Sequence, residues 1–128
     1  MAAAVAIHVA DEALTGFLAL YNPLVLQIRE RLRWFPAPTF TFPVWLGGLA
    51  AGVSLLVMLA PAVKRGMFGT RLASYVLSAL MILNGLGHIL GSIYFGRLLP
   101  GIKSAPLLLA SSLWLLHRTL RRKHLQCR

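Results

Sequence analysis

Two histidines and two neighbouring carboxylates are placed where they could form one polar centre. His8, Asp11 and Glu12 lie near the start of the sequence, and His88 lies in its third apolar segment. Imidazole binds iron, zinc, copper and nickel in proteins, whereas carboxylates favour harder ions such as manganese. The combination predicts a site for a single metal ion, with iron, manganese or zinc as the candidates.

The spacing of the N-terminal group predicts a polar stripe along one side of a helix. Residues three, four and seven positions apart share a helix face. The residues with these separations are His8, Asp11, Glu12 and Thr15. An ionised carboxylate that faces lipid costs at least ~2.5 kcal/mol. The stripe must therefore face a partner within the protein, or its helix must lie outside the membrane.

The third apolar segment carries a face that could be this partner. Asn84 and His88 are one helical turn apart, and Gly87 and Gly91 lie on the same side. Glycine allows two membrane helices to approach closely. We expect the polar stripe to face His88, because Glu12 and Asn84 lie at nearly the same depth if the first and third segments both span and run in parallel.

Each polar residue has an expected role in a metal centre. His8, Glu12 and His88 are the expected ligands, and Asp11 is either a further ligand or an acceptor that orients one. Asn84 is expected to donate a hydrogen bond that fixes a carboxylate, because groups around the ligands hold them in place.

Other interpretations of the same residues stay open. The acids could join helices through hydrogen bonds to the histidines, as polar residues in membrane helices often do. The N-terminal segment could lie at the membrane surface with its acids in water. Without a metal, the carboxylates could also relay protons in a small transporter.

The composition indicates a membrane protein. The 128 residues are 58% hydrophobic and 12% charged, whereas soluble domains are about half apolar and about a quarter charged. The net charge of +10 does not indicate nucleic-acid binding, because the basic residues stand at the edges of apolar runs. Contact with anionic lipid headgroups explains their placement better.

Four apolar segments predict an all-α fold, a four-helix transmembrane bundle formed as one domain. A bilayer core of about 30 Å needs about 20 apolar residues in a helix. The expected helices cover residues 2–21, 43–63, 71–95 and 104–120. Asn22 and Pro23 are expected to end the first helix, and Ser104 is expected to cap the last. Residues 24–35 could form a short helix on the membrane surface.

Four spans would place both termini on one side of the membrane. The second loop and the C-terminal tail hold more Lys and Arg than the first and third loops. The positive-inside rule then predicts that both termini are cytoplasmic. The expected location is a bacterial cytoplasmic membrane.

Three motifs follow one another in an order typical of a known family. They are His8-x-x-Asp11-Glu12, Asn84-x-x-x-His88, and the stretch from Pro100 to Pro106 that contains Gly101 and Ser104. This order resembles the HXXEE domain family, which comprises small, mainly microbial membrane proteins, and the resemblance covers residues 5–117. Asp11 stands where the family has its first Glu, and its shorter reach leaves Glu12 as the stronger ligand. The resemblance supports the site and implies no particular reaction.

The leading hypothesis is a small multi-pass membrane protein whose polar centre binds a metal and acts on a lipid-soluble small molecule. The sequence leaves open whether the protein is an enzyme. Membrane lipids are the expected partners, and a homo-oligomer is compatible with the sequence. The competing class is a structural or accessory membrane subunit whose polar residues only specify how helices pair.

Overall fold

The computed structural model describes residues 1–67 and 69–126, with side chains to residue 121, and this part of the chain is helical with no strand. Its helices are α1 (Ala2–Thr15), α2 (Phe17–Arg31), α3 (Phe42–Arg65), α4 (Thr70–Phe95) and α5 (Ala105–Gln126). The basic side chains at positions 122, 123 and 128, which count in the predicted topology, lie outside the described part. The all-α prediction is confirmed.

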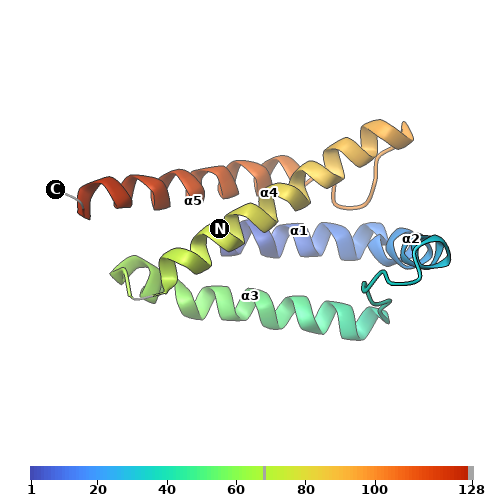
Figure 1. Ribbon diagram of the computed structural model, residues 1–128, viewed down its shortest axis with the longest axis horizontal. Coiled ribbons are helices and arrows are strands. Elements are labelled where there is room, and N and C mark those ends of the chain that lie inside the picture. The colour runs from blue at the N-terminus through green and yellow to red at the C-terminus, as the bar shows by residue number, and fades with distance from the viewer. Residues whose placement is uncertain (68, 127–128) are drawn as a thin grey trace.

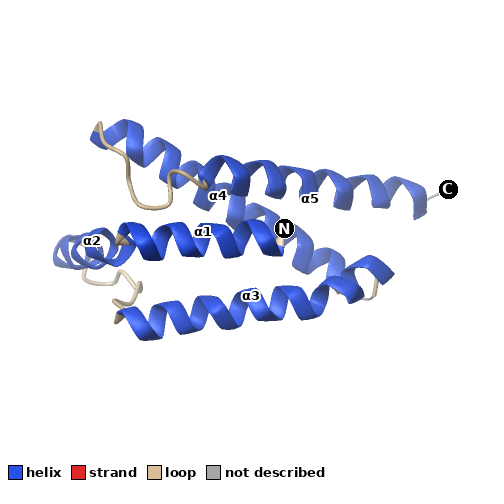
Figure 2. Ribbon diagram, turned by 180° about the vertical axis from the view of Figure 1, so that it is seen from behind, coloured by secondary structure: helices blue, strands red, loops and turns tan. Residues whose placement is uncertain are grey.

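Four of the helices run along the length of the molecule, and α2 lies across one end (Figure 1). α1 and α4 run in one direction, and α3 and α5 run in the other. α4 and α5 form the most extensively packed pair, and α1 lies between α3 and α5 (Figure 2). The parallel arrangement assumed for the first and third segments therefore holds for α1 and α4.

The prediction of one helix over residues 2–21 is wrong, because the helix breaks at Gly16. This glycine is left-handed, with φ of 78°, and its N–H bonds to the carbonyl of Glu12, which ends α1. α1 and α2 differ in direction by 80°. Glycine adopts this conformation without the clash that a Cβ would cause. The expected surface helix at residues 24–35 is in part the second half of α2.

Asn22 and Pro23 do not end a helix, because both lie inside α2. Pro23 lacks an N–H, so α2 loses one backbone hydrogen bond there. The Asn22 amide instead donates to the carbonyl of Phe40 at 2.8 Å and accepts from the Phe40 N–H at 3.1 Å. This pair of bonds ties α2 to the chain that enters α3.

The other three predicted helices are present with small changes at their ends. α3 and α4 each end at a left-handed glycine, Gly66 and Gly96. α5 begins one residue later than predicted and continues six residues further. Helix ends differ by a residue or two with the criteria used to define them, but the extension of α5 is larger than that.

Only two helices of the described part, α3 and α4, are by themselves long and apolar enough to cross a membrane. The bent pair α1 and α2 would add a third if it formed one broken span. α1 has 14 residues, which is about 21 Å of helix and short of the bilayer core. Four separate spans are therefore not supported. α5 is not among the candidate spans, because the second half of this helix carries several basic residues.

Many large apolar side chains are exposed on the surface, and polar side chains are buried beside apolar ones in the interior. In α3 only Trp45 is buried, and large side chains such as Met58 are exposed. The buried side chains of α1, α4 and α5 include histidines, serines and a glutamate. Of these polar groups, His8, Glu12 and His88 lie together where α1 meets α4 and the loop before α5.

Candidate metal centre

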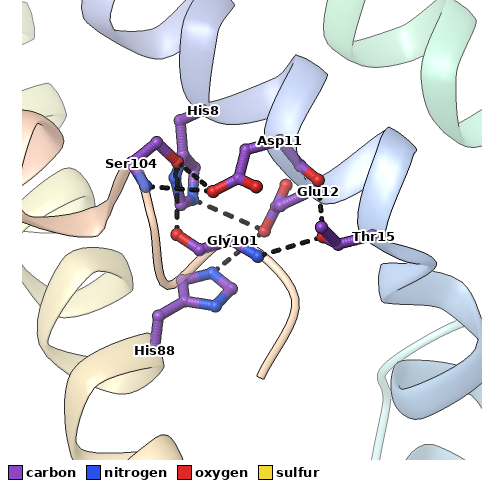
Figure 3. A network of polar contacts seen from close by, with 7 residues as sticks. All are labelled: His8, Asp11, Glu12, Thr15, His88, Gly101 and Ser104. Atoms are coloured by element: carbon purple, nitrogen blue, oxygen red, sulfur yellow. Dashed lines mark hydrogen bonds and ion pairs between the residues drawn. The ribbon is translucent and has the colours of Figure 1, made fainter. Parts of the chain in front are cut away.

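Two helices bring His8, Glu12 and His88 into one buried group, as the spacing predicted (Figure 3). His8 and Glu12 are one turn apart on α1, and His88 comes from α4. His8 Nε2 lies 3.5 Å from Glu12 Oε1, and His88 Nε2 lies 3.0 Å from the same oxygen. One ligand atom from each residue lies within 4.8 Å of the others, so one metal ion could contact all three once the two imidazoles move slightly closer together.

The α4–α5 loop supplies the other half of the site. Asp11 Oδ2 accepts two hydrogen bonds from Ser104, at 2.9 Å from the backbone N–H and at 2.8 Å from the hydroxyl. The Gly101 N–H donates to Thr15 Oγ1 at 3.3 Å. The polar stripe of α1 therefore faces this loop as well as α4 (Figure 3).

A hydrogen-bond chain from Asp11 through Ser104 fixes the orientation of the His8 ring. Ser104 Oγ has one hydrogen, and the Asp11 carboxylate at 2.8 Å is a nearer acceptor than the carbonyl of Gly101 at 3.2 Å. Ser104 Oγ then accepts from His8 Nδ1, which lies 2.8 Å away. In a neutral His8 ring the proton is then on Nδ1, and the lone pair is on Nε2 and directed at Glu12.

This lone pair is in an unfavourable position when no cation is near. His8 Nε2 is buried and has no hydrogen bond with any residue that the structure describes, and at 3.5 Å the Glu12 oxygen is beyond good hydrogen-bond distance. A buried polar atom without a partner costs about 1–3 kcal/mol. A cation between the nitrogen and the carboxylate would remove this cost, and a shared proton is the other remedy.

Gly101 and an aromatic group enclose the site on two sides. Gly101 is left-handed, and a Cβ there would lie 2.8 Å from Cε1 of His88 and 3.1 Å from Cγ of Glu12. The Phe17 ring lies 6.0 Å from the His88 ring and stacks on Trp45 at 5.8 Å. The loop backbone and these rings leave little room for water around the histidines, and such a shell controls solvent access to a metal.

The other two candidate residues, Asp11 and Asn84, do not belong to the His-Glu-His group. Asp11 lies outside the His-Glu-His group and acts on His8 through Ser104, which is the second of its two expected roles. Asn84 is half-buried and forms no hydrogen bond with the residues that the structure describes. The donor that fixes a carboxylate is Ser104, where the sequence predicted only a helix cap. The stretch from Gly101 to Ser104 was the signal for this role, because it follows the His88 segment directly.

Two imidazoles and one carboxylate are a well-known ligand set for metals. Zinc hydrolases use two histidines and a glutamate, and non-haem iron proteins use two histidines and one carboxylate on one face of the ion. With metal–ligand bonds of about 2.0–2.1 Å, neighbouring ligands around a tetrahedral ion are about 3.3 Å apart. The two contacts of Glu12, at 3.0 and 3.5 Å, lie on either side of this value.

Comparisons of this chain with protein-family models, with curated proteins and with solved structures return no match. Function must therefore be inferred from the geometry of the site.

Proposed function

We propose that this chain is a small integral membrane protein that holds one transition-metal ion between His8, Glu12 and His88. The observation that supports this most directly is the buried His8 Nε2, which has no hydrogen bond and is directed at Glu12. The chain from Asp11 through Ser104 places the proton of a neutral His8 ring on Nδ1 and leaves the Nε2 lone pair available to a cation. This is the state in which imidazole binds a metal.

The exposed surface of α3 supports a membrane location. α3 is long and apolar enough to cross a membrane, and Trp45 is its one buried residue. Met58 is 76% exposed and Leu55 is 55% exposed. Soluble monomers rarely expose apolar patches above a few hundred Å², whereas hydrocarbon accommodates them. The resemblance to the HXXEE domain family fits this location, and we propose that the termini are cytoplasmic.

Iron, manganese or zinc would supply Lewis-acid chemistry when bound, and iron or manganese could also change oxidation state. Three protein ligands leave a coordination position open, as in catalytic rather than structural metal sites. The Phe17 ring beside His88 would favour a lipid-soluble small molecule over a polar one. We propose that such a molecule is the substrate class of the centre.

The metal content of purified protein tests this proposal. We would compare wild type, Glu12→Gln and His88→Ala after purification in nonionic detergent and measure the metal-to-protein ratio by mass spectrometry. Glu30→Gln and His117→Ala are matched controls, because these residues are exposed and lie outside the site. Wild type and both controls should carry one ion per chain, and the site variants should carry none.

The second candidate function is structural, with the same residues only joining helices. The 3.0 Å contact of His88 with Glu12 favours it, because this pair can form without a metal. A wild-type protein that is folded and free of metal would support the structural function and contradict the metal centre. Helix content and gel-filtration behaviour show whether each sample is folded.

A further inference from the structure

A second feature of the molecule is a groove of about 500 Å³ at the end where α3 ends and α4 begins. No residue of the metal centre lines it. Its volume is within the range of about 300–1,000 Å³ typical of small-molecule sites. Leu59 and Trp114 on its walls are 42% and 57% exposed, so the groove is open to the surroundings of the protein. Its apolar walls come from α3, α4 and α5 and include Leu56, Leu59, Val63, Leu77 and Leu115.

The polar lining of the groove is strongly basic. Lys64, Arg71 and Arg118 line it, and no acidic residue does. The guanidinium of Arg118 lies over the Trp114 ring at 5.0 Å, an arrangement that holds the cation beside the groove. The groove therefore combines a concentration of positive charge with an apolar interior.

Arg71 has a hydrogen-bonding group without a partner at this place. Its Nη2 atom is buried and forms no hydrogen bond with any residue that the structure describes. A buried guanidinium N–H without an acceptor is costly. The lining offers no carboxylate to accept it, so an anion from outside the chain would be its partner once the guanidinium turns toward the groove.

We propose that this groove binds one anionic phospholipid, with its phosphate on Arg71 and an acyl chain along the apolar walls. Guanidinium groups bind phosphate through two parallel hydrogen bonds. Basic pockets between membrane helices bind anionic headgroups in this way. Lys64 and Arg71 stand at the ends of the two candidate spans, which is the level of the headgroups. The inference rests on the proposed membrane location and not on the metal.

Native mass spectrometry of the full chain in nonionic detergent tests the lipid site. Phosphatidylglycerol and phosphatidylcholine with identical acyl chains are added separately. We expect one phosphatidylglycerol per chain, bound about tenfold or more tightly than phosphatidylcholine. Arg71→Gln should weaken phosphatidylglycerol binding about tenfold or more, because it removes charge-assisted hydrogen bonds.

Arg65→Gln is the matched control for charge, because it removes one cation at the same end of α3 but outside the groove. It should leave binding within about twofold of wild type. Ala60→Trp fills the groove and keeps every cation, so it should abolish binding. Its control is Leu55→Trp, which adds the same ring to α3 outside the groove.

Several results would overturn the lipid site. They are equal binding of the two lipids, equal losses in Arg65→Gln and Arg71→Gln, retained binding in Ala60→Trp, or inorganic phosphate raising the melting temperature as much as the lipid. Metal content measured on the same samples separates the two proposals. Absent metal with Arg71-dependent lipid binding contradicts only the metal centre, and a chain that does not fractionate with membranes contradicts the membrane location and the lipid site.

Discussion

Ser104→Ala should weaken metal binding although Ser104 is not a ligand. The substitution removes the hydroxyl that lies 2.8 Å from both Asp11 Oδ2 and His8 Nδ1. The backbone N–H of residue 104 would still donate to Asp11 at 2.9 Å, so the loop keeps one of its links to α1. His8 loses the acceptor that holds its proton on Nδ1.

The expected loss is about 10- to 100-fold in metal affinity, the usual effect of removing a group that orients a ligand. This corresponds to about 1.4–2.7 kcal/mol. The two lost hydrogen bonds, one of them to a carboxylate, should lower the free energy of unfolding by about 2–4 kcal/mol. Both effects are small enough for the variant to be purified and titrated if the fold retains a typical stability.

The assay is competition for zinc or iron between the protein in detergent and a chelator of known affinity. Ser78→Ala is the matched control, because Ser78 is fully buried and its hydroxyl bonds only to the carbonyl of Ser74 on its own helix. It should bind metal like wild type. If Ser104→Ala also binds metal like wild type, the hydrogen-bond chain does not orient His8 for metal binding, and this prediction is refuted.

Two further predictions concern the loop and the membrane. Gly101→Ala should displace His88 and lower metal affinity, because its Cβ would lie 2.8 Å from the ring; Gly66→Ala has a similar φ of 70° with nothing within 4 Å and should cost only the backbone strain of about 1–2 kcal/mol. Titration of both variants checks this, and equal metal affinities would contradict it. Leu55→Arg should reduce membrane insertion by about 3 kcal/mol, measured as the fraction of chains resistant to alkaline extraction, whereas Leu32→Arg, which lies beyond the end of α2, should insert normally. If both insert equally, α3 does not face lipid.

The grouping of His8, Glu12 and His88 could be predicted from the sequence. His8 and Glu12 are one turn apart, so any helix through them presents both on one face. His88 is the histidine of the long third segment, and a buried carboxylate needs a partner. Those two constraints predict that the three residues lie together, and in the structure they do.

The break at Gly16 and the role of the loop could not be read as easily. Gly16 stands in an apolar run, where glycine can either continue a membrane helix or end it. Thr15, the residue before it, did not indicate a helix end. In the structure its hydroxyl bonds both to its own helix and to the loop. Ser104 matched the pattern of a helix cap, and only the tertiary fold shows that its hydroxyl lies between Asp11 and His8.

The most direct test of the metal centre is X-ray absorption spectroscopy at the edge of the metal that copurifies with wild-type protein. We predict one ion per chain, with two imidazole nitrogens at about 2.0–2.1 Å and a carboxylate oxygen at about 2.0–2.2 Å. His88→Ala should remove one imidazole from the spectrum of reconstituted protein. A spectrum without imidazole ligands, or a folded wild-type protein that takes up no metal, would contradict the metal centre.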